Sequence, residues 1–179
     1  ILPPTRLEAK AQGRGRREEI ANALQKLMSE LQFKASNYER PMLASIIDAS
    51  KKYGAKKIVL EDMNRAPMNY RNFFIRSLAL SSVLKKSIKG QNIGILLPNI
   101  LANPVTIAAL HKIGKTPAML NYTAGSASIN NALKAAEVQT IISARKFIDK
   151  ADLAGLISEL KAEVIYLEDM AKNLGGSAR

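Results

Sequence analysis

Hydrophobic positions in the middle of the chain form short continuous runs that are separated by segments with helical spacing. Residues 93–97 are a run of strand length, and a Pro98-Asn99 turn ends it. Residues 103–113 carry apolar side chains on one helical face, and residues 116–120 form a second apolar run. This order predicts a strand, a helix and a strand, which together form a βαβ unit with a right-handed crossover.

The ends of the predicted helix carry specific signals. Asn103 is the expected N-cap, and Pro104 suits the first helical position. Gly114 stands where the end of a helix favours a left-handed residue, and Lys112 suits the negative end of the helix dipole. The expected apolar stripe of this helix consists of Val105, Ala108, Ala109 and Ile113.

Three further apolar runs are predicted as strands, and they lie at residues 57–60, 139–143 and 163–167. The segments between the runs predict helices at residues 41–53, 69–87, 126–137 and 144–160, while residues 168–179 have the composition of a loop or fraying end. Because short apolar runs alternate with helices, the predicted class is α/β. We expect one largely parallel sheet between residues 56 and 167, with helices on both faces.

The most regular amphipathic helix is predicted near the start, at residues 16–36, with Glu18 and Glu19 in its first turn. We interpret it as a linker helix that packs on a neighbour. An amphipathic helix lying on a membrane is the alternative, which the mixture of acids and bases on its polar face disfavours. The face that would be buried consists of Ile20, Leu24, Leu27, Met28 and Leu31.

Composition narrows the classes of function. The chain has 47% hydrophobic residues, as globular proteins do, and it has no cysteine, which excludes disulfides and thiolate chemistry. The net charge of +12 favours acidic partners, but no stacking aromatics accompany the bases, so no nucleic-acid partner is expected. Residues 91–110 are uncharged over the length of a membrane span, yet Pro98 and Pro104 favour a buried strand and helix instead.

Residues that could take part in catalysis or ligand binding are few and scattered along the sequence. His111 is the single histidine, and we interpret it as a packed or edge residue. The acid pairs Glu61-Asp62 and Glu168-Asp169 each follow a strand, and solvated turn residues are the favoured interpretation. The segment 121–123 also follows a strand and could line a cleft. No catalytic, cofactor-binding or metal-binding residue is assigned.

The order of three segments resembles the N-terminal part of the adenylate-forming acyl-activating enzymes. These segments are the helix at 70–86, the GQNIGILLPN strand at 90–99 and the KIGKTPAMLN segment at 112–121. More narrowly, residues 117–151 resemble the bacterial acyl-acyl carrier protein synthetases that are fused to a 2-acylglycerophosphoethanolamine acyltransferase. The opening ILPPTRLE resembles the exit from that acyltransferase domain.

The resemblance implies a division of the chain. Residues 1–15 would be the tail of a preceding acyltransferase domain, residues 16–40 a linker helix, and residues 41–179 an incomplete N-terminal portion of an AMP-binding domain. The phosphate-gripping loop, the aromatic-Thr-Glu motif and the C-terminal lysine of the family would follow Arg179. We therefore expect this chain to be a fragment that is inactive by itself and that can self-associate through uncovered surface.

The resemblance also implies the activity of the parent protein. It would use ATP and Mg²⁺ to activate a fatty acid as an acyl-adenylate, and would transfer the acyl group to acyl carrier protein and to a lysophospholipid. The expected location is cytoplasmic, at the cytoplasmic face of the bacterial inner membrane, where anionic lipid would suit a basic surface. The alternatives are a basic α/β module that binds nucleic acid and a peripheral membrane module that works through residues 16–36.

Overall fold

A computed structural model describes residues 4, 6, 8, 10, 12–36, 38–63 and 65–176 of the protein. The side chains of Arg14 and of residues 173–176 are not described. The chain divides into two compact units, Ile1–Pro41 and Met42–Arg179, and each unit is considered by itself. The boundary lies next to the predicted one between residues 40 and 41. About half of the expected acyltransferase tail at 1–15 lies outside the described residues, and its origin remains a prediction.

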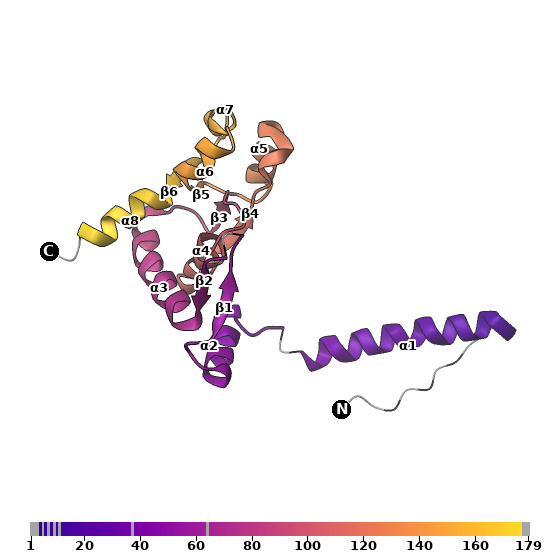
Figure 1. The fold of residues 1–179 in the computed structure, drawn as a ribbon. Helices are drawn as coiled ribbons and strands as arrows, with labels where there is room; N and C mark the ends of the chain where they lie inside the picture. The colour runs from indigo at the N-terminus through magenta and orange to yellow at the C-terminus, as the bar shows by residue number, and fades with distance from the viewer. Residues whose placement is uncertain are drawn as a thin grey trace. The chain divides into compact units, whose positions relative to one another are not determined.

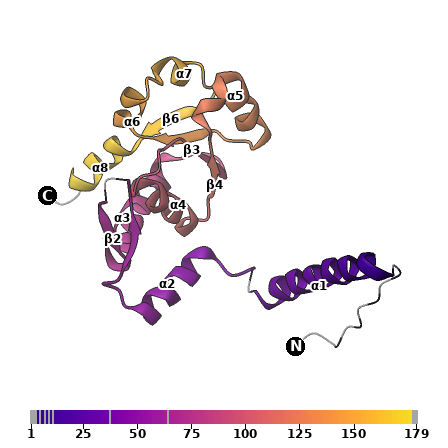
Figure 2. The same cartoon turned by 45° about the vertical axis from the view of Figure 1, so that its right-hand side comes forward.

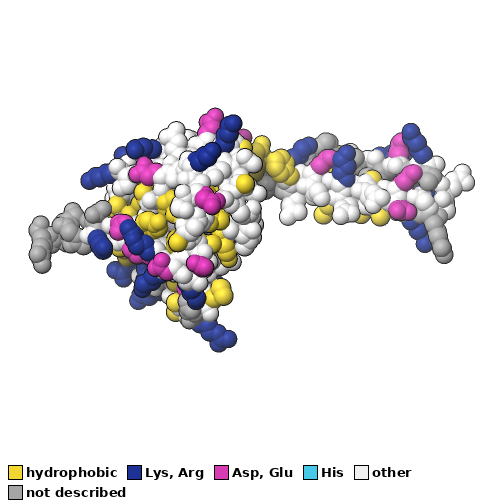
Figure 3. Space-filling view, turned by 90° about the horizontal axis from the view of Figure 1, so that it is seen from above, with side chains coloured by type: hydrophobic (Ala, Val, Ile, Leu, Met, Phe, Trp, Pro, Cys, Tyr) yellow, Lys and Arg dark blue, Asp and Glu magenta, His cyan; other side chains and the backbone are white. Residues whose placement is uncertain are grey.

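The first unit contains α1 (Gly13–Ala35), which lies close to the predicted helix at 16–36. It begins earlier than predicted, so Glu18 and Glu19 do not lie in its first turn. Leu24 and Met28 are about half exposed, at 47% and 55%, and hydrophobic side chains are visible along the helix in Figure 3. The apolar stripe therefore exists as predicted, and its partner remains a prediction.

The main sheet of the second unit has four parallel strands in the order β4-β3-β5-β6. Adjacent residues of these strands point to opposite faces, so Ile93 and Ile95 face one layer of helices while Gly94 and Leu96 face the other. Strand bounds are β3 (Asn92–Ile95), β4 (Thr116–Met119), β5 (Thr140–Ser143) and β6 (Glu163–Tyr166).

The first face of the sheet is covered by α3 (Tyr70–Ser87), α4 (Ala102–Lys112) and α8 (Leu167–Gly176). Figure 1 shows these three helices in one layer. Ile93, Ile95 and Ile142 are fully buried beneath them, and burial of each such side chain stabilises the fold by about 1.5–3 kcal/mol. The helical residues that complete this core are Leu84, Ala109, Leu110 and Met170.

The second face is covered by α5 (Gly125–Ala135), α6 (Arg145–Lys150) and α7 (Ala154–Ser158), as Figure 2 shows. Leu96 and Ile141 are fully buried there. The other core residues of this face are Ile129, Leu133, Val138, Ile148 and Leu153. A parallel sheet with helices on both faces confirms the predicted fold class.

The central βαβ unit is confirmed, because β3 and β4 are parallel neighbours joined through α4. Gly114 has a positive φ of 72° directly after this helix, as a left-handed helix end requires. The predicted cap is wrong, because α4 begins at Ala102 and Leu101 is the N-cap. Asn103 is instead a buried helical residue, and its Oδ1 lacks a hydrogen-bond partner among the described residues.

The expectation of a single sheet between residues 56 and 167 is wrong for the first strand. β1 (Ile58–Glu61) pairs antiparallel with β2 (Pro67–Asn69), and the two form a separate two-stranded sheet. Met68 of β2 packs with α3 and α4, and α2 (Met42–Tyr53) covers the same cluster through Leu43 and Ile46. The strand β2 was missed because it is only three residues long and begins with a proline, which disfavours sheet pairing.

Two later predictions also differ from the structure. The predicted helix at 144–160 is interrupted between α6 and α7, where Asp152 has a positive φ of 50°. The predicted loop at 168–179 is helical through α8 as far as Gly176, and residues 177–179 lie outside the described residues. The short 3-10 helix η1 (Tyr122–Ala124) precedes α5.

The uncharged segment at 91–110 is not a single rod. It consists of β3, a turn and most of α4, so the interpretation as a buried strand and helix is confirmed. Across the part of the chain that the structure describes, every helix is too short or too polar to pass through a bilayer.

Candidate functional site

The carboxyl ends of all four strands of the main sheet meet at one edge. The connection after β3 leads to β4 on one side of the sheet, whereas the connection after β5 leads to β6 on the other side. The two chain paths therefore diverge between β3 and β5. In open α/β sheets, such a divergence leaves a crevice outside the strand ends, and ligands bind there.

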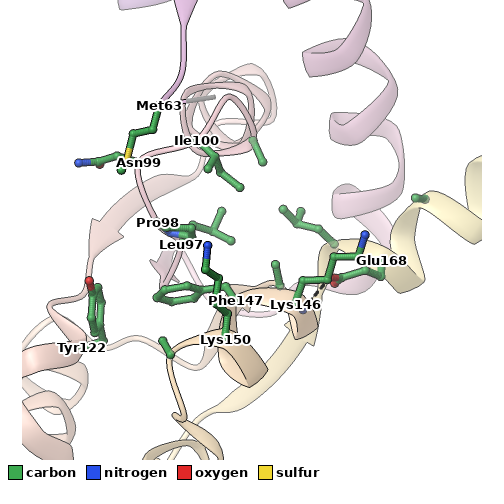
Figure 4. Close-up of a pocket in the computed structure, with 15 residues that line it drawn as sticks. Met63, Leu97, Pro98, Asn99, Ile100, Tyr122, Lys146, Phe147, Lys150 and Glu168 are labelled. Carbon is green, nitrogen blue, oxygen red and sulfur yellow. Dashed lines mark hydrogen bonds between the residues drawn. The ribbon is translucent and has the colours of Figure 1, made fainter. Parts of the chain in front are cut away.

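A cavity of about 830 Å³ lies at this edge of the sheet. Its walls come from the segments that follow all four strands, and Figure 4 shows Pro98, Tyr122, Phe147 and Glu168 around it. The lining is mainly apolar, which is typical of sites for small molecules. The apolar lining residues include Met63, Leu97, Ile100, Ala102, Ala144, Ala151, Leu167 and Ala171.

Two cations border this apolar space. Lys146 and Lys150 are one turn apart on α6, and both line the cavity. Figure 4 shows their side chains rising from α6 toward the cavity. Neither ammonium group forms an ion pair within the described part of the chain. The cavity thus combines an apolar interior with two positive charges that are available to an anionic group.

An aromatic pair forms one wall. Tyr122, which follows β4, packs edge-to-face on Phe147 of α6, with ring centroids 5.2 Å apart and an angle of 78° between the planes. The turn that carries Tyr122 is fixed by Asn121, whose Oδ1 accepts hydrogen bonds from the backbone N–H of Thr123 at 3.0 Å and from its hydroxyl at 2.8 Å. The expectation that residues 121–123 could line a cleft is met by Tyr122.

The Glu168 carboxyl group lies at the border of the cavity, at the start of α8. Its Oε1 accepts a hydrogen bond of 3.3 Å from the backbone N–H of Lys146. Partial burial raises the pKa of Glu168, but the backbone N–H groups of Arg145, Glu168 and Lys146, together with the Arg145 charge, outweigh burial. The net result is a pKa below the ordinary value, so this carboxylate is charged at neutral pH.

Arg145 holds the neighbouring segments together. Its guanidinium group lies 4.1 Å from the centroid of the Tyr166 ring and forms an ion pair of 2.6 Å with Asp169. The acid pair Glu168-Asp169 was interpreted as solvated turn residues, and that interpretation is wrong. Both residues lie in the first turn of α8 and bind the segment that follows β5.

The other candidates from the sequence lie elsewhere. Glu61 and Asp62 line a separate small hollow beside Asn103, and Asp62 Oδ1 accepts a hydrogen bond of 3.2 Å from the Ala66 N–H within its own turn. His111 is exposed at the C-terminal end of α4, away from the cavity. Within the described ranges, no three of the histidine, aspartate and glutamate side chains gather as metal ligands would.

Sequence reasoning missed Lys146, Phe147 and Lys150, which lay within one long predicted helix. Two local signals were present in the sequence. These residues come directly after a strand, and Lys146 and Lys150 are spaced so that they share a helical face. Strand order then determines that this face borders a crevice. The fold and cavity define a class of protein: an α/β protein with a cavity at the carboxyl edge of a parallel sheet, which is the edge where ligands bind in open α/β sheets.

The family follows from comparison with known proteins. The model of the AMP-binding enzyme family matches residues 47–177, which is most of the chain. The chain therefore belongs to the AMP-binding enzyme family. The match begins within α2 and ends beside α8, so it covers the whole sheet and every wall of the cavity.

Solved structures show the same fold. The N-terminal subdomain of Klebsiella oxytoca NpsA in complex with 3-hydroxyanthranilyl-AMSN matches with a TM-score of 0.58 and 21% identity, over 73% of this chain and 32% of that chain. NpsA-ThdA, an artificially fused adenylation–PCP di-domain from the same organism, matches with a TM-score of 0.56 and 20% identity, over 73% and 23%. A benzoate CoA ligase from Burkholderia xenovorans matches with a TM-score of 0.57 and 15% identity, over 69% and 25%. The chain thus spans about a third or less of these proteins.

Proposed function

We propose that this chain contains part of the N-terminal subdomain of an enzyme that activates a fatty acid as an acyl-adenylate and transfers it to acyl carrier protein. The same protein would pass the acyl group to 2-acylglycerophosphoethanolamine at the cytoplasmic face of the bacterial inner membrane. Membership of the AMP-binding family supports the adenylation step. The resemblance of residues 117–151 to synthetases fused with an acyltransferase supports the two acceptors.

The choice of a fatty acid as the substrate rests on the cavity at the carboxyl edge of the main sheet. A fatty acid is an apolar chain with one negative end, and this cavity offers an apolar interior bordered by Lys146 and Lys150. Its volume of about 830 Å³ lies within the range of small-molecule sites. In the proposed arrangement, the acyl chain contacts Leu97 and Phe147, and the carboxylate lies near the two ammonium groups.

The choice of a carrier protein as acceptor rests on the resemblance of residues 117–151 described above. One structural relative is an artificially fused adenylation–PCP di-domain, so its fusion to PCP adds no support for a carrier protein as the natural acceptor. ATP and Mg²⁺ belong to the proposed reaction of the complete enzyme. The acids near the cavity, Glu168 and Asp169, are engaged with the first two residues of α6, so we place neither ATP nor Mg²⁺ on a residue of this chain.

The first experiment measures the reaction. ATP–pyrophosphate exchange is assayed with the intact gene product and with the 179-residue chain, using fatty acids and benzoate as substrates. We expect exchange with fatty acids by the intact gene product and none by the 179-residue chain. Exchange with benzoate but not with fatty acids would overturn the substrate class. Sustained adenylate formation by the 179-residue chain would overturn the prediction that it is inactive by itself.

The second experiment measures binding to the cavity in the 179-residue chain with a fluorescent fatty acid. Ala171→Phe adds bulk at an exposed helical position of the lining, and Ala135→Phe makes the same change on α5 outside the lining. We expect Ala171→Phe to weaken binding at least about tenfold, whereas Ala135→Phe leaves it unchanged. Lys150→Gln should weaken binding of the acid but not of its methyl ester. Equal effects on acid and ester would exclude a carboxylate contact with Lys150.

A further inference from the structure

The edge of the main sheet opposite the cavity gathers the ends of several helices. α3, α4 and α5 each lead directly into the amino end of a strand, so their C-terminal ends lie at the same edge as the starts of β3, β4 and β5. Hydrogen bonds join the neighbouring segments there, including one of 2.7 Å from Gln91 Nε2 to the Gly114 carbonyl. We define the amino edge as residues 85–91, 111–116, 134–139 and 159–163.

The amino edge is strongly basic. It contains three carboxylates, Glu137, Glu159 and Glu163, against seven lysines and His111, and it has no arginine, tryptophan, tyrosine or phenylalanine. Each of the three helices has lysine in its last turn, which suits the negative end of its dipole. Because the topology brings these helix ends to one edge of the sheet, their lysines together give this edge a positive charge. The lysines are Lys85, Lys86, Lys89, Lys112, Lys115, Lys134 and Lys161.

Few of these lysines are used within the unit. Lys89 forms an ion pair of 3.4 Å with Glu163, and Lys115 Nζ donates a hydrogen bond of 2.6 Å to the Gly90 carbonyl. The other five are exposed and form no ion pair with any residue that the structure describes. Their charge is therefore available to a partner.

A hollow of about 450 Å³ lies within this basic region, between the ends of α3 and α4. Lys85 and Lys112 line it from the two helices, together with Ser81, Ser82 and Ile113. The hydroxyls of Ser81 and Ser82 already donate to carbonyl groups of α3, so the lysines supply the donors that the hollow offers to an anion. Lysine binds phosphate as a point charge, so two lysines that line one hollow favour an anionic group there.

We propose that the amino edge binds the surface of an anionic phospholipid membrane, with lipid phosphates placed between Lys85 and Lys112. Clusters of four to eight basic residues bind anionic lipid surfaces, with each contributing about fivefold to affinity. Protein interfaces are depleted in lysine and enriched in aromatic residues and arginine, so the composition of this edge favours lipid over a protein partner. Single-stranded nucleic acid is disfavoured because the amino edge has no tryptophan, tyrosine or phenylalanine for base stacking, and His111 supplies its one ring.

This inference deepens the proposed function, since it supplies the contact with the membrane on which a lysophospholipid acceptor would be found. It does not depend on adenylation. Vesicle binding needs neither ATP nor fatty acid, so failure of either proposal is seen separately. The cavity lies at the carboxyl edge, so binding through the amino edge would leave the cavity open to solvent.

The test is co-sedimentation of the full chain with vesicles of phosphatidylglycerol and phosphatidylcholine, and with vesicles of phosphatidylcholine alone. We expect binding only to the anionic vesicles, and release at high salt because exposed charge contacts are screened. The variant Lys85→Glu/Lys112→Glu should weaken binding about 25-fold or more. The matched control Lys56→Glu/Arg76→Glu makes the same change in net charge at exposed positions outside the amino edge and should bind nearly as the unaltered chain does.

Equal loss of binding in both double variants would overturn the proposal, because net charge rather than this edge would then be responsible. Equal binding to neutral vesicles would also overturn it. RNA or an acidic protein is added as a competitor in a further arm. If either binds through Lys85 and Lys112 more tightly than the anionic vesicles do, the lipid assignment fails. Circular dichroism and thermal unfolding of each variant establish that the fold is retained.

Discussion

The Ser143 hydroxyl donates a hydrogen bond of 2.8 Å to the Leu96 carbonyl, across the boundary between β5 and β3. Ser143 is fully buried, and the Leu96 N–H donates to the Ile142 carbonyl at 2.9 Å, so backbone and side chain both join the strands here. The bond lies where the chain paths diverge, directly beside the cavity. A side chain thus continues the pairing of these strands beyond the last regular backbone bond.

Replacement of Ser143 tests how much its hydrogen bond to the Leu96 carbonyl contributes to the stability of the fold. Ser143→Ala leaves the buried Leu96 carbonyl without that donor, and we expect the free energy of unfolding to fall by about 1–3 kcal/mol. Ser82→Ala is the control, because its hydroxyl bonds only within α3 and is exposed. It should change stability by less than about 0.5 kcal/mol. Urea unfolding of both variants measures the difference, and equal values would show that the Ser143 bond adds little.

Gly94 lies where a side chain has no room. A Cβ atom there would approach Leu120 Cδ1 to 2.9 Å and Ile141 Cγ1 to 3.0 Å. We expect Gly94→Ala to lower the free energy of unfolding by about 1–3 kcal/mol through overpacking. Gly155→Ala is the control, since no atom lies within 4 Å of its Cβ position in α7 and alanine favours helices. Thermal unfolding should show a lower midpoint only for the first variant.

Glu168 makes stability depend on pH in a defined direction. Its pKa is lowered in the folded state by backbone N–H groups and Arg145, despite burial, so its charged form favours folding. This contribution is present at neutral pH, above the ordinary pKa of a carboxyl group, and is lost as the pH falls through the lowered value. We expect Glu168→Gln to be less stable than the unaltered chain at neutral pH, and the difference to shrink in acid. A difference that stays constant or grows on acidification would contradict this.

A buried hydroxyl offers a stabilising change. Ser77 is 4% exposed in α3, and its Oγ has no hydrogen-bond partner among the described residues. Ser77→Ala removes this unsatisfied group and improves helix propensity, so we expect the free energy of unfolding to rise by about 0.5–2 kcal/mol. Ser81→Ala is the matched variant, because the equally buried Ser81 hydroxyl bonds to the Leu78 carbonyl at 2.8 Å. A gain of the same size in both variants would mean that propensity alone is responsible.

The sequence predicted those parts of the fold that local pattern determines. The run at 93–97, the glycine at 114 and the run at 116–120 each follow from spacing or backbone conformation, and the structure has all three. The prediction placed β1 in the wrong sheet because its partner β2 is only three residues long and begins with a proline, so the sequence pattern does not reveal it. The prediction placed the N-cap of α4 at Asn103 because asparagine is a favoured N-cap residue. In the structure the helix begins earlier, and Leu101 is its N-cap.

The cavity could be predicted only in part. Ligands of open α/β sheets generally bind at the carboxyl ends of the strands. The sequence therefore allowed the prediction that Tyr122, which follows a strand, could line a cleft, and it does line the cavity. Lys146 and Lys150 could not be recognised, because their role depends on the order of strands, which the sequence does not specify by pattern. Glu168 was misjudged for a related reason: its hydrogen-bond donor belongs to the segment after another strand, far away in the sequence.

The position of β3 between β4 and β5 has a consequence for synthesis on the ribosome. β4 emerges soon after β3, but β5 follows only after α5 has been made. Until Thr140–Ser143 leaves the exit tunnel, one margin of β3 presents unpaired peptide groups, and Ile93 and Ile95 lack their neighbour Ile142. A nascent chain that stalls when α5 but not β5 has left the tunnel would therefore be a target for chaperones. One that stalls after β5 has left the tunnel would already hold its central strand on both sides.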